Sequence, residues 1–534
     1  MALVEDNVSP GPGSLIWGIP DWTLGVLSVS LIVIALDVTI LNVAIPTLQR
    51  ELNASAAALQ WIVNAYILVF AGLLLTMGAL GDKFGRRRAL EVGLVIFGLA
   101  SLGAAYAETS SLLIVARVAQ GIGGALIMPS TLSILVDVFP REERAKAIGI
   151  WAGVAAIGIP IGMIVGGWLL ESYWWGVVFL INIPVALGAL IAGRFLVPES
   201  KDASAPKLDL PAAAISMLGL SLLIYTIIEA PERGWLDPLT LAGFAATIVI
   251  GTAFALYELR VAHPMLDVRL FRNARLSGGV TAVGVAFMAM LGTMFIITQY
   301  FQFVRDYSPL DTGYRMAPMA VGFMIGAPVS AILVSRVGTK WTVAFGLVVL
   351  GSAVAMLYTL DISTSVWVPT AALLVFGIGG ANAMAPATDA VMAALPDAQA
   401  GVGSALNDTT RQVGGALGVG IFGSVLNSLY TSNVAEGVVN LSEKMTAQAE
   451  NSIGGALSVA SDLEGPASEA LTTAAKSAFI DASSPVYVAV GSVAILGAVI
   501  AVAFLPSRDT DSVDELGSTS TDGLTPAAAP VSID

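Results

Sequence analysis

The sequence predicts an all-α polytopic membrane protein with fourteen transmembrane helices. Of its 534 residues, 56% are hydrophobic and only 12% are charged, which is about half the charged fraction of an average soluble domain. The apolar residues lie in long continuous runs rather than in short alternating segments, and this pattern favours a helix bundle over a β-barrel. An internal repeat further indicates that two similar groups of helices form most of the bundle.

Each apolar run is long enough to cross a hydrocarbon core, which takes about 20 residues. The runs are expected at 22–46, 59–80, 89–106, 112–136, 147–170, 176–197, 211–229, 239–258, 276–303, 313–335, 341–360, 366–390, 401–430 and 485–506.

The distribution of Lys and Arg predicts how these helices are oriented. Of the 25 basic residues, 17 lie in the tail or in loops that follow even-numbered helices, and 6 lie on the opposite side. Cytoplasmic loops carry an excess of Lys and Arg, so the even-numbered helices are expected to end in the cytoplasm. Because the number of helices is even, both termini are then cytoplasmic.

The repeat is visible as a recurring glycine motif. Residues 121–125, Gly-Ile-Gly-Gly-Ala, recur at 377–381, an offset of 256 residues, and the same offset relates Gly158 to Gly414. An even number of helices separates the copies, so the two halves have the same topology. We expect them to be related by an axis along the membrane normal, with a binding site between them near mid-membrane.

This repeat predicts the domain organisation. The regions are a cytoplasmic N-terminal segment (1–21), an N-terminal six-helix half (22–197), a linker with two inserted helices (198–275), a C-terminal six-helix half (276–506) and a disordered tail (507–534). Within the C-terminal half, the external segment 431–484 is rich in Ala, Ser and Glu and is broken at Gly465-Pro466. It is predicted to form two surface helices joined by a turn over the external mouth, with a disordered loop as the alternative.

The composition also excludes several kinds of site. The chain has no cysteine, its single His263 lies in a charged loop, and no G-x-x-x-x-G-K-[ST] phosphate-binding loop is present. We therefore expect no metal, no cofactor, no ATP-driven pump and no enzyme. The net charge of −14 repels phosphate, so a nucleic acid is not an expected partner. A membrane enzyme or a receptor is a remote alternative to a transporter.

Two charges inside predicted spans are the strongest candidate functional residues. Asp37 lies about 9 residues, or ~13 Å, from the outer end of its helix, and Arg117 lies about 7 residues, or ~10 Å, from the outer end of its own. Intramembrane charges are expensive and usually functional, and the similar depths predict that these two meet. A purely structural ion pair is the alternative.

A second charge cluster is expected near the cytoplasmic side. Asp408 and Arg411 lie inside the predicted span 401–430, and Asp389 of the preceding span could join them. An inner gate, a proton site and a structural pair are equally compatible with this pattern.

Aromatic side chains near these positions can stack on a cationic substrate, although packing or a membrane-interface belt is the alternative. The candidates are Trp61, Tyr66, Tyr300 and Phe301.

The loop GALGDKFGRRRAL, residues 78–90, resembles the signature loop of the major facilitator superfamily. Glycine permits a tight turn there, and the acid can cap a helix or pair with the basic cluster. In that family the loop pins the two halves in one state. The resemblance assigns this gating role to Gly81, Asp82, Gly85, Arg86 and Arg87.

Two further motifs resemble elements of proton-coupled members of that superfamily. Residues 113–124, LIVARVAQGIGG, match an R-x-x-Q-G element, which implies that Arg117 assists proton transfer. Residues 153–167 resemble the antiporter signature G-x-x-x-G-P-x-x-G-G, with Met163 in place of the motif proline. Its small residues four apart favour close helix packing, and a proline can bend the helix. The residues are Gly158, Pro160, Gly162, Gly166 and Gly167.

Taken together, most of residues 22–506 resemble the fourteen-helix drug/proton antiporters. The resemblance implies a multidrug exporter in a bacterial cytoplasmic membrane, a monomer whose partners are the lipid bilayer, protons and a small hydrophobic or cationic substrate. It makes Asp37 the candidate proton and cation site, where proton and drug compete for one charge. Some relatives that export dications have a second acid where this chain has Asn64, which argues against dication export. A dedicated exporter of one natural product, lipid or metabolite is the alternative.

Overall fold

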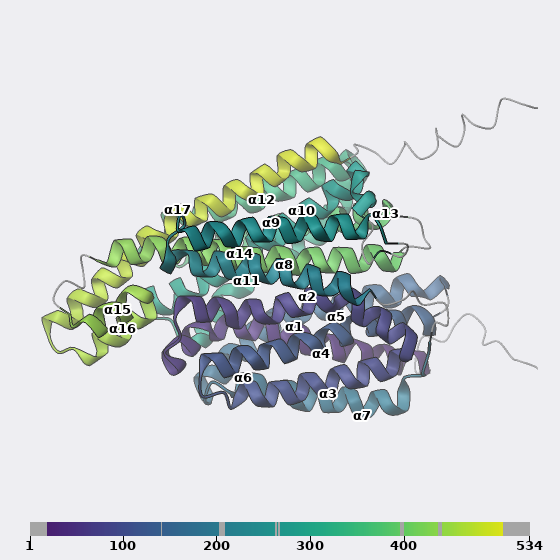
Figure 1. The fold of residues 1–534 in the computed structure, drawn as a ribbon, viewed down its shortest axis with the longest axis horizontal. Helices are drawn as coiled ribbons and strands as arrows, with labels where there is room; N and C mark the ends of the chain where they lie inside the picture. Colours follow the sequence, from purple (N-terminus) through teal and green to yellow (C-terminus); the bar gives the residue numbers. More distant parts are fainter. Residues whose placement is uncertain are drawn as a thin grey trace, which may run out of the picture.

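The computed structural model describes residues 19–139, 141–201, 209–261, 264, 268–395, 400–435 and 441–505. The predictions for His263, for the first 18 residues and for the tail 507–534 fall outside this description. The described residues form helices and connecting turns without a β-strand, which confirms the all-α fold (Figure 1).

The first group of helices covers the N-terminal third of the chain. It consists of α1 (Ile19–Leu52), α2 (Ala56–Phe84), α3 (Arg86–Ala105), α4 (Ser110–Val138), α5 (Arg141–Ser172), α6 (Val177–Leu180) and α7 (Asn182–Leu196). The predicted run 176–197 is thus interrupted, because α6 ends before Ile181 and α7 begins after it.

The second group lies in the C-terminal half. It consists of α10 (Ala274–Gln299) with the π-helical turn η2 (Tyr300–Val304), α11 (Pro309–Val337), α12 (Thr339–Met356) with η3 (Leu357–Thr359), α13 (Trp367–Ala393), α14 (Ala400–Val434) and α17 (Pro466–Phe504). Between the groups come α8 (Leu210–Arg233), α9 (Pro238–Glu258) and the short η1 (Val268–Arg272). Helix α8 packs on both α2 and α14, whereas α9 packs on α8.

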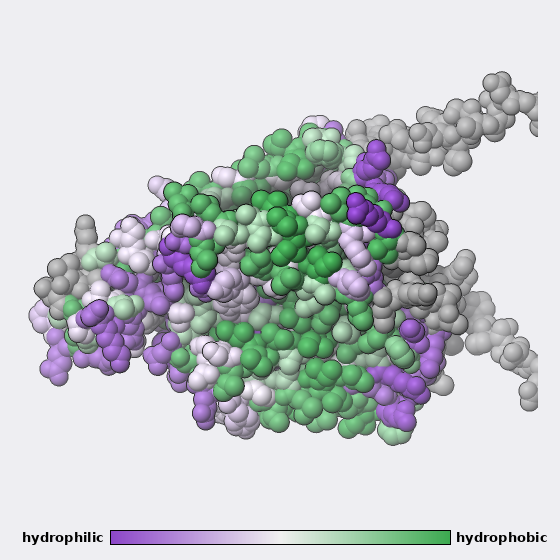
Figure 2. All heavy atoms as spheres, viewed as in Figure 1, coloured by the Kyte–Doolittle hydropathy of each residue, from purple (hydrophilic) through white to green (hydrophobic). Residues whose placement is uncertain are grey.

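Hydropathy marks the part of the bundle that faces lipid. In the described part of the chain, 13 helices are long and apolar enough to cross a membrane, and α5 contributes a shorter apolar stretch, Ile161–Ser172. Figure 2 shows hydrophobic side chains covering the middle of the visible face and hydrophilic ones gathered towards both ends. This belt is what a bilayer requires of a membrane-spanning bundle.

The helix pairings of the first group recur in the second. In the first group, α1 packs against α5 and α7, α2 against α4, and α3 against α4 and α7. In the second, α10 packs against α14 and α17, α11 against α13, and α12 against α13 and α17. Between the groups, α5 packs against α11 and α2 against α14. The order of equivalent helices is the one that the sequence repeat predicts.

The repeated glycines lie where these equivalent helices touch. A Cβ atom on Gly121 would lie 2.8 Å from the carbonyl oxygen of Tyr66 in α2, and one on Gly377 would lie 2.0 Å from that of Met319 in α11. Such distances leave no room for a side chain. Glycine is therefore repeated because it lets α4 and α13 approach α2 and α11 closely.

The glycines of α5 make similar close contacts. A Cβ atom on Gly162 or Gly166 would meet Thr39 or Ile40 of α1, and one on Gly167 would lie 2.6 Å from the backbone of α11 at Leu310. Gly158 faces Ala35 of α1 at 3.1 Å. The side chain of Pro160 is outside the description. This motif thus joins α5 to α1 within the first group and to α11 of the second.

Two short helices, α15 (Glu443–Asn451) and α16 (Ile453–Asp462), lie over one end of the bundle, at the left in Figure 1. We call this the cap end, and we call the opposite end, where α2 passes into α3 at Gly85, the basic end. The predicted position of the helix break is only partly right. The two short helices meet at Ser452, whereas Gly465, with a φ of +65°, separates α16 from α17. Helix α17 therefore begins well before the predicted residue 485.

Candidate functional site

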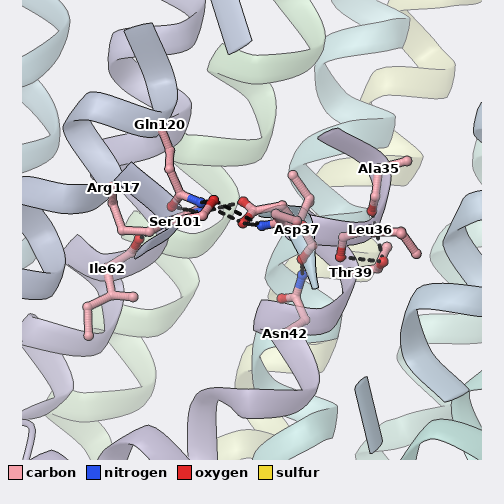
Figure 3. Close-up of polar contacts among 11 residues, drawn as sticks. Ala35, Leu36, Asp37, Thr39, Asn42, Ile62, Ser101, Arg117 and Gln120 are labelled. Carbon is pink, nitrogen blue, oxygen red and sulfur yellow. Dashed lines mark hydrogen bonds and ion pairs between the residues drawn. The ribbon is translucent and has the colours of Figure 1, made fainter. Parts of the chain in front are cut away.

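The predicted pair of Asp37 and Arg117 is present inside the first group. The two residues lie on α1 and α4 with exposures of 2% and 1%, and Nη1 of Arg117 forms an ion pair with Oδ2 of Asp37. Figure 3 shows their side chains extended toward each other across the space between the helices. The structure thus brings together the two charges whose depths along their helices were expected to be similar.

Two amides complete the surroundings of the carboxylate. Oδ1 of Asp37 accepts hydrogen bonds from Nε2 of Gln120 and from Nδ2 of Asn182, each at 3.0 Å. Both amide nitrogens also lie within hydrogen-bond distance of Oγ of Ser101, at 2.9 and 3.3 Å. Helices α3, α4 and α7 therefore all contribute to holding the Asp37 side chain.

The guanidinium of Arg117 is held from three further directions. Its Nε donates to the carbonyl oxygen of Ile62 at 3.1 Å, and its Nη1 donates to Oε1 of Gln120 at 2.9 Å. The guanidinium carbon lies 4.3 Å from the ring centre of Tyr66, a cation–π distance. Charge-assisted hydrogen bonds of this kind are roughly twice as strong as neutral ones, so this buried charge is well compensated.

This arrangement can respond to a proton. A carboxylate only accepts hydrogen bonds, and each described side chain that is hydrogen-bonded to Asp37 donates to it. A proton on Asp37 would remove the charge that Arg117 pairs with and leave the amides of Gln120 and Asn182 facing a neutral acid. The carboxylate of Asp37 therefore links α1 to α4 and α7 through its hydrogen bonds.

At the basic end, the loop around Gly85 is fixed by ion pairs within the first group. Asp82 pairs with Arg86 at 2.7 Å, and Glu199 lies 3.9 Å from Arg87 and 3.5 Å from Arg88. Gly85 has a φ of +128°, and a Cβ atom there would lie 2.7 Å from Glu199. Gly81 approaches Ala89 and Ser130. In the described residues, the loop makes its ion pairs with residues of α2, α3 and α4 and with Glu199, which follows α7.

Comparison with known proteins agrees with this architecture. The family model described as Major Facilitator Superfamily matches residues 27–419. The chain belongs to the Major Facilitator Superfamily.

Curated members of the superfamily resemble the chain over nearly its whole length. It is 32% identical over 503 residues to a tetracenomycin C resistance and export protein of Streptomyces glaucescens, covering 93% of this chain and 94% of that protein. It is 34% identical over 485 residues to the multidrug efflux pump LfrA of Mycolicibacterium smegmatis, covering 90% and 95%.

Among solved structures, a bacterial homologue of the human lysosomal transporter Spinster, in an inward-facing and unoccupied conformation, aligns with a TM-score of 0.63. The alignment covers 93% of this chain and all of the other at 16% identity, so it concerns the fold alone.

Among the predicted aromatic residues, Tyr66 lies beside the Asp37–Arg117 pair, with its ring against the guanidinium of Arg117. The others lie elsewhere. The ring centre of Trp61 is 6.3 Å from that of Tyr225 on α8. Tyr300 and Phe301 are buried in η2 at the cap end, where the hydroxyl of Tyr300 donates to the carbonyl oxygen of Asp361 at 2.9 Å. Both contribute to packing in this conformation.

Asn64 lies in the seam between the two groups. It is fully buried, and neither atom of its side-chain amide has a hydrogen-bond partner among the described residues. A Cβ atom added to Gly420 of α14, in the second group, would lie 3.8 Å from Nδ2 of Asn64. A buried amide without a hydrogen-bond partner is costly.

The second predicted cluster forms only in part. Arg411 lies 3.6 Å from Asp408 and donates to Oγ1 of Thr388 at 3.2 Å. Asp389 is exposed on α13 and makes no ion pair with either residue in the described part of the chain. Its inclusion was wrong because Thr388, one residue earlier, is on the face of α13 that meets Arg411.

Sequence reasoning missed Ser101, Gln120 and Asn182. Gln120 lies three residues after Arg117 on the same helix, a spacing that places side chains side by side, so it could have been found. Ser101 and Asn182 carry no charge and no recognisable spacing to Asp37, and only the packing of α3 and α7 brings them there.

Proposed function

We propose that this superfamily member exports small hydrophobic, cationic drugs across a bacterial cytoplasmic membrane in exchange for protons. The buried bonding network of Asp37 is the observation that carries the proposal, because it couples one proton-binding group to three helices of the first group. The relatives named for drug resistance and efflux support the substrate class. The helices form a transporter, and no catalytic step is required of them.

The orientation follows from the charge distribution. We place the basic end in the cytoplasm, because Lys83 and Arg86 to Arg88 lie there and positive loops stay inside. The cap end then faces outward. We also infer that the chain acts as a monomer and that residues 22–197 and 276–506 move as two halves around residues at their interface.

The described contacts favour a conformation closed on the outside. Side-chain hydrogen bonds between the two groups run from Gln302 to the Val43 carbonyl at 2.8 Å and from Ser424 to Gln60 at 3.1 Å. A third runs from Ser308 to Glu171 at 3.4 Å. All three are towards the cap end of the helices that carry them.

In the proposed cycle, Asp37 takes up a proton when the site faces outward. The proton neutralises the acid, weakens its bond to Arg117 and lowers its attraction for a cationic drug. Release of the proton to the cytoplasm restores the carboxylate, which then attracts the next cation. Proton and drug compete for one charge, and that competition couples their opposite flows. Gly81, Asp82, Gly85, Arg86 and Arg87 would hold the halves in one state until the switch.

The test is transport by purified protein in proteoliposomes with an imposed pH gradient. Wild-type protein should accumulate ethidium, a fluorescent cation, only when the gradient is present. Asp37→Asn should abolish gradient-driven accumulation while leaving the far-UV circular dichroism spectrum unchanged. Undiminished transport by this variant would refute Asp37 as the coupling site.

A dedicated exporter of one natural product is the second candidate, and the resemblance to a tetracenomycin C export protein favours it. Expression in a pump-deficient host separates the two. A multidrug pump raises the resistance to several chemically unrelated compounds, whereas a dedicated exporter raises the resistance to one.

A further inference from the structure

The side chain of Asn182 uses its donors but not its acceptor. Asn182 is the first residue of α7 and is only 1% exposed, and its Nδ2 donates to Oδ1 of Asp37 at 3.0 Å. Its own oxygen, Oδ1, is buried and has no hydrogen-bond partner among the described residues. A buried acceptor without a partner is costly, so this orientation of the amide leaves a bonding group unused beside the carboxylate.

The local sequence interrupts the helix at this amide. Helix α6 ends at Leu180, and α7 begins at Asn182. Pro184 has no N–H group, so the carbonyl oxygen of Leu180, four residues earlier, lacks its usual helical donor. Helix α7 packs against α1 and α3. The interruption therefore places Asn182 where it can reach both Asp37 and Ser101.

A proton on Asp37 would create a donor that needs an acceptor. Arg117 pairs with Oδ2 of the carboxylate, so Oδ1 is the oxygen that is free of the cation. A neutral acid has one O–H donor. On Oδ1, that hydrogen would face the nitrogens of Gln120 and Asn182, which both donate to the same oxygen. In the present arrangement the donors would meet without an acceptor between them.

The acceptors around Oδ1 are occupied, except for one. Oε1 of Gln120 accepts from Nη1 of Arg117 at 2.9 Å. Oγ of Ser101 accepts from both amides, at 2.9 and 3.3 Å, and a hydroxyl oxygen has only two lone pairs. Among the amides and the hydroxyl of this bonded group, only Oδ1 of Asn182 is unused.

The charged and titratable neighbours of this group are Arg117 and Tyr66 among the described residues. Tyr66 lies with its ring against the guanidinium, 4.3 Å from its carbon. Its hydroxyl is directed toward Gly124 of α4, where an added Cβ would lie 3.1 Å from it, and makes no hydrogen bond to Asp37. Neither neighbour offers the acceptor that a protonated Asp37 needs.

We propose that Asn182 is a positioning residue that turns its side-chain amide over when Asp37 takes up a proton. Half a turn about the Cβ–Cγ bond exchanges Oδ1 and Nδ2. Oδ1 then accepts the O–H of the acid, and it can also accept the hydroxyl hydrogen of Ser101, which takes part in neither amide contact of that residue. One atom of the amide is unpaired in either orientation, so Asn182 serves both forms of the acid.

The proposal rests on the export function proposed above and deepens it. One O–H bond forms on Oδ1 when a proton enters from outside, and the same bond breaks when that proton leaves to the cytoplasm. The proton weakens the bonds of Asp37 to Arg117 and Gln120 on α4, whereas Asn182 keeps a bond to it in both states. Protonation therefore loosens α1 from α4 and leaves α1 attached to α7.

Infrared difference spectroscopy of the purified full chain tests this rotation. The protein is produced with asparagine that carries carbon-13 at the side-chain carbonyl, and it is titrated with acid. The carboxylic-acid band that Asp37→Asn removes marks protonation of Asp37. A labelled asparagine band should shift with the same midpoint, because its oxygen passes from unpaired to hydrogen-bonded. No labelled band should shift in Asp37→Asn.

Asn382 of α13 offers a matched control. It is also fully buried with an unpaired Oδ1, and its Nδ2 donates to the carbonyl oxygen of Ile378 at 2.8 Å rather than to a carboxylate. Asn182→Ser should remove the labelled shift and slow gradient-driven transport about tenfold, the effect of losing one hydrogen bond to an ionisable group. Asn382→Ser should change neither.

An acid band that appears without a labelled shift would overturn the rotation, and so would a shift that survives in Asn182→Ser. The titration of the wild-type protein decides the first point even if that variant does not fold. The spectra need no proton gradient. A labelled shift in a protein that does not transport would refute the export function and leave the rotation intact, whereas transport without the shift would refute only the rotation.

Discussion

The carboxylate of Asp37 accepts more hydrogen bonds than a purely structural ion pair needs. Arg117 alone would neutralise its charge, yet Gln120 and Asn182 also donate to it and are themselves fixed by Ser101. Such positioning holds the acid in one orientation. In the proposed cycle, a proton on this acid would disturb that bonding.

A double substitution separates the structural role of the pair from its transport role. Arg117→Gln leaves a buried carboxylate without its cation and should destabilise the protein by roughly 3–5 kcal/mol. Combining it with Asp37→Asn removes both charges, so the thermal unfolding temperature in detergent should recover. Gradient-driven transport should not recover. If transport returned together with stability, the pair would have a structural role only.

At the level of helices, glycine decides which helices can meet. Gly377 of α13 and Gly121 of α4 occupy equivalent positions and touch the backbones of α11 and α2. The recurrence of the motif thus has a packing cause, and the sequence repeat correctly indicated equivalent helices. The sequence could not indicate which neighbour each glycine touches, because that depends on how the helices are placed around one another.

Gly377→Ala tests this packing. The added methyl group would lie 2.0 Å from the carbonyl oxygen of Met319, so α11 and α13 must separate. We expect a loss of roughly 1–3 kcal/mol, measured as a lower unfolding temperature in detergent. Gly188→Ala on α7, where nothing lies within 4 Å, is the control and should be neutral or slightly stabilising. Equal effects of the two substitutions would contradict the packing argument.

Helices α15 and α16 together connect the two groups at the cap end. Gly454 packs on Gln49 of α1, and Asn451 accepts a hydrogen bond from the backbone of Ala56 at 3.3 Å. On the other side, the hydroxyl of Tyr430 in α14 donates to the carbonyl oxygen of Ala449 at 3.2 Å. Helices α15 and α16 must therefore lose their contacts with one of the two groups before the groups can separate at the cap end.

A reversible crosslink tests that requirement. A Cβ atom on Gly454 would lie 2.9 Å from Cγ of Gln49, so Gln49→Cys combined with Gly454→Cys should form a disulfide. Oxidation should stop transport, and a reductant should restore it. The two single variants are the controls and should not respond to oxidant. Full transport by the crosslinked protein would show that α16 need not leave α1.

At the scale of the whole molecule, the distribution of Lys and Arg predicts that the basic end faces the cytoplasm and the cap end faces outward. An impermeant maleimide applied to intact cells should label Ser461→Cys at the cap end. Lys83→Cys at the basic end should be labelled only after the membrane is permeabilised, because the positive loops are retained inside. The reverse pattern would invert the proposed direction of transport.

The sequence by itself determined the composition of the bundle and its internal symmetry. Long apolar runs must form helices in a bilayer, since every backbone group has to be bonded within its own segment. The glycine repeat marked equivalent helices, and the positions of Asp37 and Arg117 along their helices predicted that they meet. Each of these inferences depends on distances along a single helix or on matching positions of the repeat.

Only the tertiary structure decided which side chains surround those charges. Asn182 reaches Asp37, and Ser101 reaches the amides that bond to Asp37, because α3 and α7 pack beside α4 and α1. Asp389 turns away from Arg411, and Thr388 takes its place. Contacts between helices depend on their rotation and separation, and neither quantity is encoded by the spacing of residues within one helix.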